Sequence, residues 1–308
     1  MNTKRSLLGC CSLLLLTALT WAVDIPKQYR SVDPAKIGWK QVRRFPVGVE
    51  KPQAIAADAK GDLYLAGKKT ICQLSPEGKV RRTITLSFTP NCLTIDAKGT
   101  IFAASKDRIW KVTGEKAVAS KPITKGMLTG IAATEDHLFV NDAGNRCVWH
   151  LKRPLDGNSR PERLTKDRFV IPSPYFDLVL GSDGLLRIVD PGRHQIKHYT
   201  QKGLHETPLD WGRYGSKLEQ FPTCCNPAHI ALLSDESVVT VEKKIPRVKV
   251  YSLDGKLQSV VIDPKGLIEN RPFETTAARL VVDVAVGPND EIYLLDPLAK
   301  EVRCFKKK

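Results

Sequence analysis

The chain has 308 residues, of which 42% are hydrophobic and 26% are charged, and its formal net charge is +15. This hydrophobic content excludes a disordered chain, and the length allows one large domain or two ordinary ones. The positive charge favours anionic partners. Because charge informs on partners rather than on fold, the fold has to be derived from the pattern of residues along the chain.

The first 22 residues have the order of a secretory signal peptide. Lys4 and Arg5 precede an apolar run from Leu7 to Leu19, and small residues end the segment at Ala22. The run is too short for a comfortable transmembrane helix. We expect cleavage after Ala22 and export to the periplasm or the extracellular space. A lipoprotein signal ending at Cys10 is less favoured, because only four residues separate that cysteine from Arg5.

The mature chain would still be basic, with a formal charge of +13 after loss of Lys4 and Arg5. In an exported protein the expected anionic partner is an envelope component such as a polysaccharide, a lipid headgroup or an acidic protein, and nucleic acid is not expected. No later segment is apolar enough to span a membrane. An oxidising compartment would permit disulfides, although the sequence does not choose the pairing. The six cysteines that remain are Cys72, Cys92, Cys147, Cys224, Cys225 and Cys304.

Six copies of one unit fill the rest of the chain. Each copy has an apolar strand, a turn such as "AKG", "SDG" or "PND", a second apolar strand, a polar turn and a third alternating strand. The apolar residues that anchor the first strands follow one another at intervals of 38, 38, 47, 52 and 54 residues. Repeats of this length with three or four strands are typical of propeller blades. The anchors are Ile55, Leu93, Ile131, Leu178, Ile230 and Val284.

The sixth copy ends after three strands, so a strand from elsewhere is needed to complete it. The segment "WKQVRRFPV", Trp39 to Val47, alternates like a strand and precedes the first copy. We expect it to pair with Glu301–Phe305, because ring closure removes exposed sheet edges. The sequence therefore predicts an all-β, six-bladed propeller over residues 39–308, preceded by a linker over residues 23–38.

Three stretches connect these copies to a known family. "NDAGNRCVWHL" and "EKKIPRVKVYSLDGKL" show an acid, a short turn, an Arg and an alternating strand that ends in a turn. "WGRYGSKLEQFPTCCNPAHIAL" has Gly-x-x-Gly, an aromatic residue and a Pro before the next inner strand. Residues 39–308 thus resemble the NHL-repeat family of six-bladed β-propellers. "CCNPAHIA" together with "EKKIPRVKVY" resembles an uncharacterised, exported bacterial subgroup with a CCNPxH motif.

The resemblance implies a fold and no single activity, because the family includes lyases, relatives of lactonases and simple binding modules. For the lactonase and amidating-lyase relatives, the resemblance implies channel metal ligands two positions before each first-strand anchor. Those positions hold at most weak ligands here, so direct transfer of either activity lacks support. They read Gln53, Asn91, Thr129, Phe176, Ala228 and Val282.

The stretch "FPTCCNPAHIAL", Phe221 to Leu232, places two thiols side by side just before a predicted inner strand. Three interpretations of Cys224 and Cys225 stay open. One or both could form bridges to distant cysteines, they could join His229 in a metal or cofactor site, or they could be a redox-active vicinal pair. A lone buried cysteine would serve core packing as well as a pair, so chemistry or a bridge explains the pair better.

The family's geometry implies that this loop meets the turn at Glu242, Lys243 and Lys244 near the mouth of the central channel, where loops on a rigid scaffold tend to carry function. We expect the two lysines to favour the thiolate forms of the cysteines. The resulting ligand-binding candidates are Cys224, Cys225, Asn226, His229, Glu242, Lys243 and Arg247.

A second pattern lies at the start of the inner strands. The residues directly before three consecutive anchors are Asp177, His229 and Asp283, with Cys92 in the equivalent position across the ring. Imidazole and carboxylate groups can hold zinc or another transition metal, or carry out acid–base chemistry. The alternative is that these side chains point between blades and are satisfied by backbone groups. The cofactor therefore stays open between none and a transition metal.

A third pattern is a ring of acids at the ends of the second strands. A ring of carboxylates could bind a cation. We favour a structural role, in which each acid accepts hydrogen bonds from its own turn or pairs with a nearby arginine, as Glu242 could with Arg247. The acids are Asp142, Asp190, Glu242 and Asp296 in copies three to six.

These patterns favour a secreted propeller that binds a ligand or a partner protein at its channel mouth. One alternative is a metal- or thiol-dependent enzyme that uses Cys224, Cys225 and His229, and another is a scaffold in a cell-envelope complex. Whether the protein is an enzyme stays open, because the sequence has no "GxSxG", "HExxH" or "CxxCH" motif and no phosphate-binding Gly/Lys loop.

Overall fold

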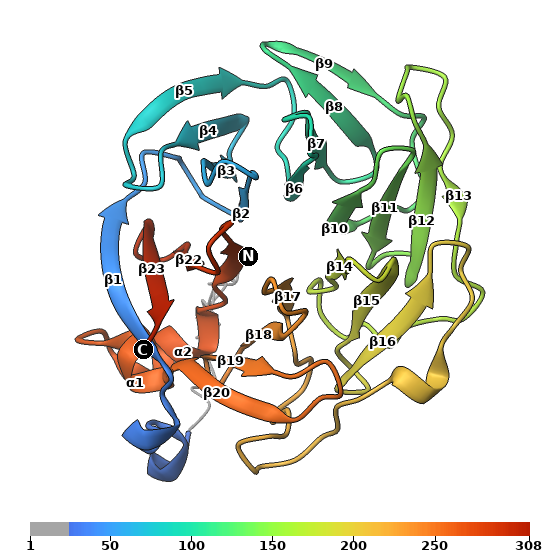
Figure 1. Cartoon of the computed structure of the whole chain (residues 1–308). Helices are drawn as coiled ribbons and strands as arrows, with labels where there is room; N and C mark the ends of the chain where they lie inside the picture. Colours follow the sequence, from blue (N-terminus) through green and yellow to red (C-terminus); the bar gives the residue numbers. More distant parts are fainter. Residues whose placement is uncertain (1–24) are drawn as a thin grey trace, which may run out of the picture.

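The computed structural model describes residues 25–308, so the predicted signal peptide lies outside the described residues. These residues form six antiparallel sheets arranged around a central channel (Figure 1). The predicted all-β, six-bladed propeller is therefore confirmed. No helix within residues 25–308 combines the length and the apolar character needed to cross a bilayer.

The first three blades have four strands each, numbered from the channel outward. Blade one contains β2 (Ala54–Ala57), β3 (Leu63–Gly67), β4 (Thr70–Leu74) and β5 (Val80–Thr85). Blade two contains β6 (Cys92–Ile95), β7 (Ile101–Ala104), β8 (Ile109–Thr113) and β9 (Lys116–Ala119). Blade three contains β10 (Leu128–Ala133), β11 (His137–Asp142), β12 (Cys147–Lys152) and β13 (Glu162–Arg163).

The last three blades differ in their outer strands. Blade four has three strands, β14 (Leu178–Leu180), β15 (Leu185–Asp190) and β16 (Gln195–Thr200). Blade five contains β17 (His229–Leu232), β18 (Val238–Glu242), β19 (Arg247–Tyr251) and β20 (Leu257–Ile262). Blade six contains β21 (Asp283–Val286), β22 (Ile292–Asp296) and β23 (Glu301–Lys307), and its outer strand is β1 (Trp39–Pro46).

Strand β1 closes the ring as the sequence predicted. It runs antiparallel to β23, with Trp39 opposite Lys307 and Pro46 opposite Glu301. Trp39 is buried, and its Nε1 donates a hydrogen bond to Ser259 Oγ of blade five at 3.2 Å. In Figure 1, β1 lies along the outside of β23, at the boundary between the first and last blades. The two ends of the described chain are thus held in one sheet.

The first hairpin of a blade shows why these sequences turn where they do. In the "DAKGD" turn between β2 and β3, Gly61 has a φ of +85°, a conformation that costs glycine little. The Asp58 carboxylate accepts hydrogen bonds from the N–H groups of Lys60 and Asp62, both at 2.9 Å. A short polar turn is thereby satisfied locally, which frees both flanking strands to pair with each other.

The hydrophobic core lies between neighbouring blades. One cluster, for example, joins Ala66 and Ile71 of blade one to Leu93 and Ile101 of blade two. A single four-stranded sheet could not cover both of its apolar faces, so each blade depends on its neighbours.

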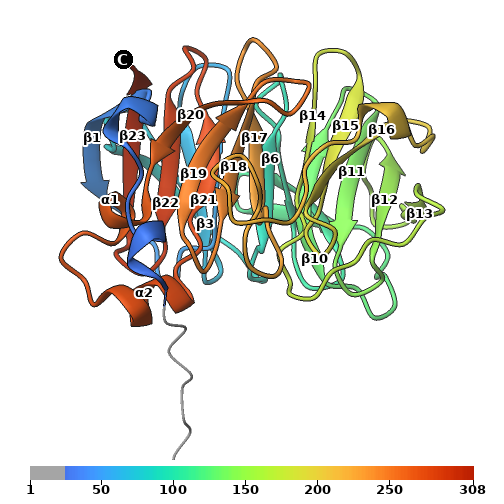
Figure 2. The ribbon, with the colours of Figure 1, turned by 90° about the horizontal axis from the view of Figure 1, so that it is seen from below.

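Short helices lie outside the repeat pattern and were not predicted from the sequence. Helices α1 (Pro264–Ile268) and α2 (Phe273–Arg279) connect β20 to β21, and α2 lies at the lower edge in Figure 2. The segment interpreted as a linker contains the 3-10 turns η1 (Lys27–Tyr29) and η2 (Pro34–Lys36). It packs on the propeller, because Arg30 Nη2 lies 2.6 Å from Glu274 Oε1 of α2.

Removal of the Trp39 side chain should test the contribution of the closing strand. We expect Trp39→Ala to lower the free energy of unfolding by about 3–5 kcal/mol, the usual cost of truncating a buried aromatic side chain. Lys40→Ala is the control, because Lys40 is exposed on the same strand and its truncation should cost less than about 0.5 kcal/mol. Denaturant unfolding measures both, and equal stability of the two variants would contradict a closing role for β1.

Candidate active site

A cavity of about 400 Å³ occupies the central channel. The six inner strands line it, and most of their contacts with it are small or aliphatic side chains such as Ala56, Ala132 and Ala231. At one end it meets a second cavity of about 400 Å³, which we call the channel mouth. The channel mouth is lined by residues that precede the inner strands, including Gln53, Asn91 and Tyr175. The face that carries these residues is called the mouth face below.

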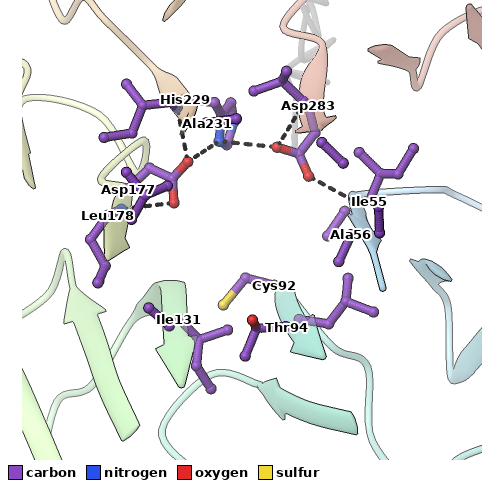
Figure 3. A pocket seen from close by; sticks show the side chains of 18 of the residues that line it. Ile55, Ala56, Cys92, Thr94, Ile131, Asp177, Leu178, His229, Ala231 and Asp283 are labelled. Carbon is purple, nitrogen blue, oxygen red and sulfur yellow. Dashed lines mark hydrogen bonds and ion pairs between the residues drawn. The ribbon is translucent and has the colours of Figure 1, made fainter. Parts of the chain in front are cut away.

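Three titratable side chains meet in the channel. His229 Nδ1 lies 3.4 Å from Asp177 Oδ2 and 3.4 Å from Asp283 Oδ1 (Figure 3). His229 and Asp283 are the first residues of β17 and β21, and Asp177 directly precedes β14. The residues come from three consecutive blades. The structure thus brings together three of the four residues named from their equivalent positions in the repeat.

Backbone N–H groups hold both carboxylates in place. Asp177 Oδ2 accepts from Ile230 N of the next blade at 3.1 Å, and Asp177 Oδ1 accepts from Leu178 N at 2.9 Å. Asp283 repeats the arrangement across the closure of the ring, accepting from Ile55 N at 2.8 Å and from Val284 N at 2.9 Å. Satisfaction by backbone groups was one alternative from the sequence, and here it coexists with a position on the channel wall.

The surroundings raise two pKa values in this cluster. Burial raises the pKa of Asp283 to about 6, reinforced by the Asp177 carboxylate and opposed by His229. For His229, burial acts to lower the pKa, but the charges of Asp283 and Asp177 outweigh it and hold this pKa above its usual value. The cluster therefore exchanges protons near neutral pH, where acid–base groups are most effective.

Both raised pKa values affect stability in the same direction. The folded protein retains protons that the unfolded chain would release, so their contribution is fully present below the unfolded pKa values. For Asp283 it is lost as the pH rises from 3.8 to about 6. For His229 it is lost as the pH rises from 6.5 through the higher folded value. The cluster thus stabilises the fold more in mild acid than in base.

Cys92 lies across the channel from this cluster (Figure 3). Its thiol lines the same cavity, but it is not part of the group whose ligand atoms lie within 4.8 Å of one another. Burial raises its pKa well above the usual range, and the Asp177 and Asp283 carboxylates add to the effect. The Cys92 thiol is therefore protonated at neutral pH, which makes it a poor metal ligand unless the metal itself displaces the proton.

A chain of contacts connects the cluster to the channel mouth. The ring of Tyr175 meets the ring of His229 edge to face, with centroids 5.7 Å apart. Lys243 Nζ lies 5.0 Å from the Tyr175 centroid and donates a hydrogen bond to Ser173 Oγ at 2.8 Å. The sequence analysis did not select Tyr175, although an aromatic residue two positions before Asp177 is a signal that could have identified it.

The adjacent cysteines lie beside the Lys243 turn rather than in the channel. Cys224 is exposed, Cys225 is buried, and all six cysteines of residues 25–308 are free thiols. Neither side chain lines the channel cavity or the channel mouth. Asn226 ties the loop down, because its Nδ2 donates to Lys243 O at 3.1 Å and its Oδ1 accepts from Lys243 N at 2.8 Å. The expected meeting with the Lys243 turn is present, and no contact between the cysteines and His229 is found among the described residues.

Lys243 and Lys244 favour the thiolate of Cys224, as expected, but other effects outweigh them. A hydrogen bond with Cys225 and partial burial raise the pKa of the Cys224 thiol above its usual value. Lys243 and Lys244 lower it, but their effect is smaller. The hydrogen bond with the neighbouring Cys225 thiol is the largest of these effects, and it favours the protonated form.

Glu242 and Arg247 form a buried ion pair instead of a ligand-binding surface. Arg247 Nε lies 2.5 Å from Glu242 Oε2, and Lys249 Nζ contacts the other carboxylate oxygen. Burial lowers the pKa of Lys249 to about 8. The pairing with Arg247 is the structural role favoured from the sequence.

The remaining acids of the predicted ring are also satisfied by their own surroundings. Asp142 Oδ1 accepts from Gly144 N and Asn145 N, and Asp296 Oδ1 accepts from Leu298 N and Ala299 N. Asp190 is buried and pairs with Arg193 at 2.7 Å. These contacts favour turn formation over cation binding.

The comparisons with known proteins identify the fold. No protein-family model matches the chain, and no curated protein matches it in sequence. Virginiamycin B lyase from Staphylococcus aureus is similar in structure, with 14% identity and a TM-score of 0.59 over 88% of this chain and 100% of that one. A gluconolactonase from Xanthomonas campestris has 12% identity and a TM-score of 0.57 over 87% and 99%. A chain of the nidogen/laminin complex has 18% identity and a TM-score of 0.56 over 70% and 81%. At such identities the likeness shows a six-bladed propeller and nothing finer.

Replacement of His229 tests the electrostatics of the cluster. We expect His229→Ala to move the pKa of Asp283 further above 6, because the opposing imidazole charge is lost while Asp177 remains. A ¹³C carboxyl titration by NMR measures this value. His150→Ala is the control, since His150 pairs with Glu162 on the outer strands of blade three. An unchanged or lowered pKa of Asp283 would show that His229 carries no charge beside it.

Thiol labelling tests the placement of the adjacent cysteines. We expect the reduced, folded protein without residues 1–22 to react with one equivalent of a maleimide, at Cys224, because Cys225 and the other four described cysteines are buried. Cys224→Ser should remove this fast phase, and denaturation should expose the remaining thiols. Two fast equivalents would show that Cys225 is accessible.

Proposed function

We propose that the chain is an exported NHL-type propeller that binds a ligand or a partner protein at its channel mouth, within the subgroup marked by CCNPxH. The propeller fold supports a binding role, because it arranges loops from six blades around one opening. The basic charge supports an anionic envelope component as a neighbour of the mature protein. The scaffold role is a variant of this proposal, in which the bound partner belongs to the envelope.

The observation that carries the proposal is the Asp177–His229–Asp283 cluster. It is a set of titratable groups on an otherwise mostly aliphatic channel wall, and it lies directly inside the channel mouth. A few convergent polar groups on the wall of a cavity fix the orientation of a small ligand. Two carboxylates beside one imidazole favour a ligand that presents a hydrogen-bond donor or a positive charge.

A metal-dependent enzyme is the second candidate, favoured by the distances from His229 Nδ1 to the Asp177 and Asp283 carboxylates. Ligand atoms about 2.1 Å from a tetrahedral zinc ion lie about 3.4 Å from each other. The Nδ1 atom of His229 lies 3.4 Å from one oxygen of each carboxylate. Neighbours in structure include a lyase and a gluconolactonase, which supports an enzyme without naming a substrate. A thiol-dependent reaction at this cluster is less favoured, because Cys224 and Cys225 do not line the channel.

Zinc titration separates the two candidates. If the cluster holds a metal, calorimetry on metal-free protein should show one zinc ion per chain, and His229→Ala and Asp283→Asn should each abolish this binding. Asp136→Asn is the control, because Asp136 is an exposed carboxylate on blade three. Absence of zinc binding by the wild-type protein would exclude a zinc-dependent enzyme and leave the ligand-binding proposal standing.

A thermal-shift screen tests the ligand-binding proposal itself. With neutral polysaccharide fragments as probes, a ligand at 100 times its dissociation constant should add about 2.7 kcal/mol of stability, or roughly 4–5 °C for a chain of this size. Tyr175→Ala and Asp177→Asn should remove the shift, whereas Tyr214→Ala, an exposed aromatic control, should retain it. Shifts that survive both channel variants would place binding elsewhere and contradict the proposal.

A further inference from the structure

A third cavity, of about 520 Å³, lies between blades four and five, away from the channel and its mouth. Its walls come from three hairpin turns, at Asp183, at Asp235 and at Leu253, and from the segment Pro208–Trp211. Strands alternate in direction, so these turns lie on the face opposite the mouth face. We call this cavity the acidic pocket. Its size is within the range of about 300–1,000 Å³ that small-molecule sites occupy.

The charge of the acidic pocket is opposite to that of the whole protein. Its lining includes four aspartates and one histidine and neither lysine nor arginine, although the full chain carries a net charge of +15. Two of the aspartates have partners behind the lining, because Asp183 pairs with the buried Arg187 and Asp210 lies 2.7 Å from His205 Nε2, so the charge of the pocket comes mainly from the other two. The carboxylate of Asp235 accepts a hydrogen bond from Ser237 N, and no cationic group among the described residues lies within ion-pair distance of it. Asp254 pairs only with Lys256, whose side chain is 84% exposed. A pocket of this charge attracts a cation.

The other wall of the pocket is apolar and firmly held. Leu209 and Leu253 are 47% and 46% exposed, which is unusual for leucines that share one concave surface. Trp211 packs against Tyr251, with ring centroids 5.1 Å apart, and lies so close to Gly255 that an added Cβ would come within 2.6 Å of the indole. The aromatic wall is therefore fixed before any ligand arrives, which reduces the entropy lost on binding.

Two buried polar atoms at the base of the pocket have no hydrogen-bond partner within residues 25–308. They are Nδ1 of His198 and Nε1 of Trp211. His198 is 1% exposed, and its Nδ1 lies 3.8 Å from Asp210 Oδ1, beyond hydrogen-bond distance. Buried polar atoms are almost always paired in folded proteins, so this pair indicates a missing partner. The nearest partner of His198 Nδ1 is Asp210, whose pKa burial would raise and the imidazole lowers, so the Trp211 Nε1 atom is the second sign of a ligand that does not depend on the acidic residues.

We propose that the acidic pocket binds a small organic amine: a molecule with an ammonium group, an aromatic or aliphatic body and a hydrogen-bonding oxygen at its far end. The ammonium group lies between the Asp235 and Asp254 carboxylates, and the body packs against Leu209, Leu253 and Trp211. The oxygen faces the His198 and Trp211 nitrogens. The indole face adds a favourable interaction with the cation. This site does not depend on the function proposed for the channel.

A matched pair of probes tests the charge requirement. Tyramine carries an ammonium group where tyrosol, its neutral counterpart, carries a hydroxyl group, and the two molecules are otherwise the same. We expect calorimetry on the full chain to give one tyramine per chain, with tyrosol binding at least about tenfold more weakly. Added salt should weaken tyramine and leave tyrosol nearly unchanged. Absence of tyramine binding, or equal affinities for the two probes, would overturn the proposal.

Variants then assign the site. Asp235→Asn with Asp254→Asn should weaken tyramine at least about tenfold without changing tyrosol, because both asparagines keep the shape and an acceptor oxygen. Leu209→Ala should weaken both probes, and since Leu209 is exposed this variant keeps the test valid if the double variant does not fold. Asp136→Asn is the control, because Asp136 is an exposed carboxylate outside the pocket, and it should bind tyramine as the wild type does. Loss of tyramine binding in Asp177→Asn, which removes a carboxylate charge from the channel, would place the amine in the channel and overturn the proposal.

Discussion

The pairing of β1 with β23 is the constraint on which the rest of the structure depends. Each blade covers one apolar face against the blade before it and the other against the blade after it. Such an arrangement is complete only when the first and last blades also meet, which requires strand 39–46 to join strand 301–307. The channel, its mouth and the acidic pocket all lie on surfaces that neighbouring blades form together, so all three depend on this closure.

The channel cluster combines support of the ring with possible chemistry. Asp177 and Asp283 each accept an N–H from the inner strand of the following blade, and each also faces His229. Carboxylates used in this way hold neighbouring blades at a fixed spacing and present their remaining lone pairs to the channel. Burial disfavours the charged form of Asp283, and the nearby Asp177 carboxylate adds to this cost, so the pKa of Asp283 is raised. The imidazole between the two carboxylates opposes this effect.

The sequence predicts the fold well because blades are local units with a strong repeat. Spacing of the anchors, the "AKG" and "SDG" turns and the missing fourth strand at the carboxyl end are enough to derive six blades and their closure. Equivalent positions in the repeat also predict that Asp177, His229 and Asp283 share one level of the channel. What cannot be predicted is what depends on irregular segments. Helices α1 and α2 lie in an insertion between blades, and the acidic pocket is built partly from the non-repeating segment Pro208–Trp211.

The adjacent cysteines illustrate a second limit. Their sequence neighbours suggested thiolate chemistry, but the pKa of Cys224 depends most on the geometry of its hydrogen bond with Cys225 and on the extent of its burial. Linear spacing contains neither quantity. Burial of Glu242 with Arg247 and Lys249 likewise follows from the packing of blade five as a whole rather than from a motif.

The register of the closing strands also determines how the chain responds to mechanical tension. Trp39 at the start of β1 lies opposite Lys307 at the end of β23, so both outward-leading ends emerge at the same edge of the sheet. A force applied to the two ends would break the hydrogen bonds between β1 and β23 one after another. In a shear geometry, the same force would load all of these bonds at once. The ring should therefore open at low force when pulled by its ends.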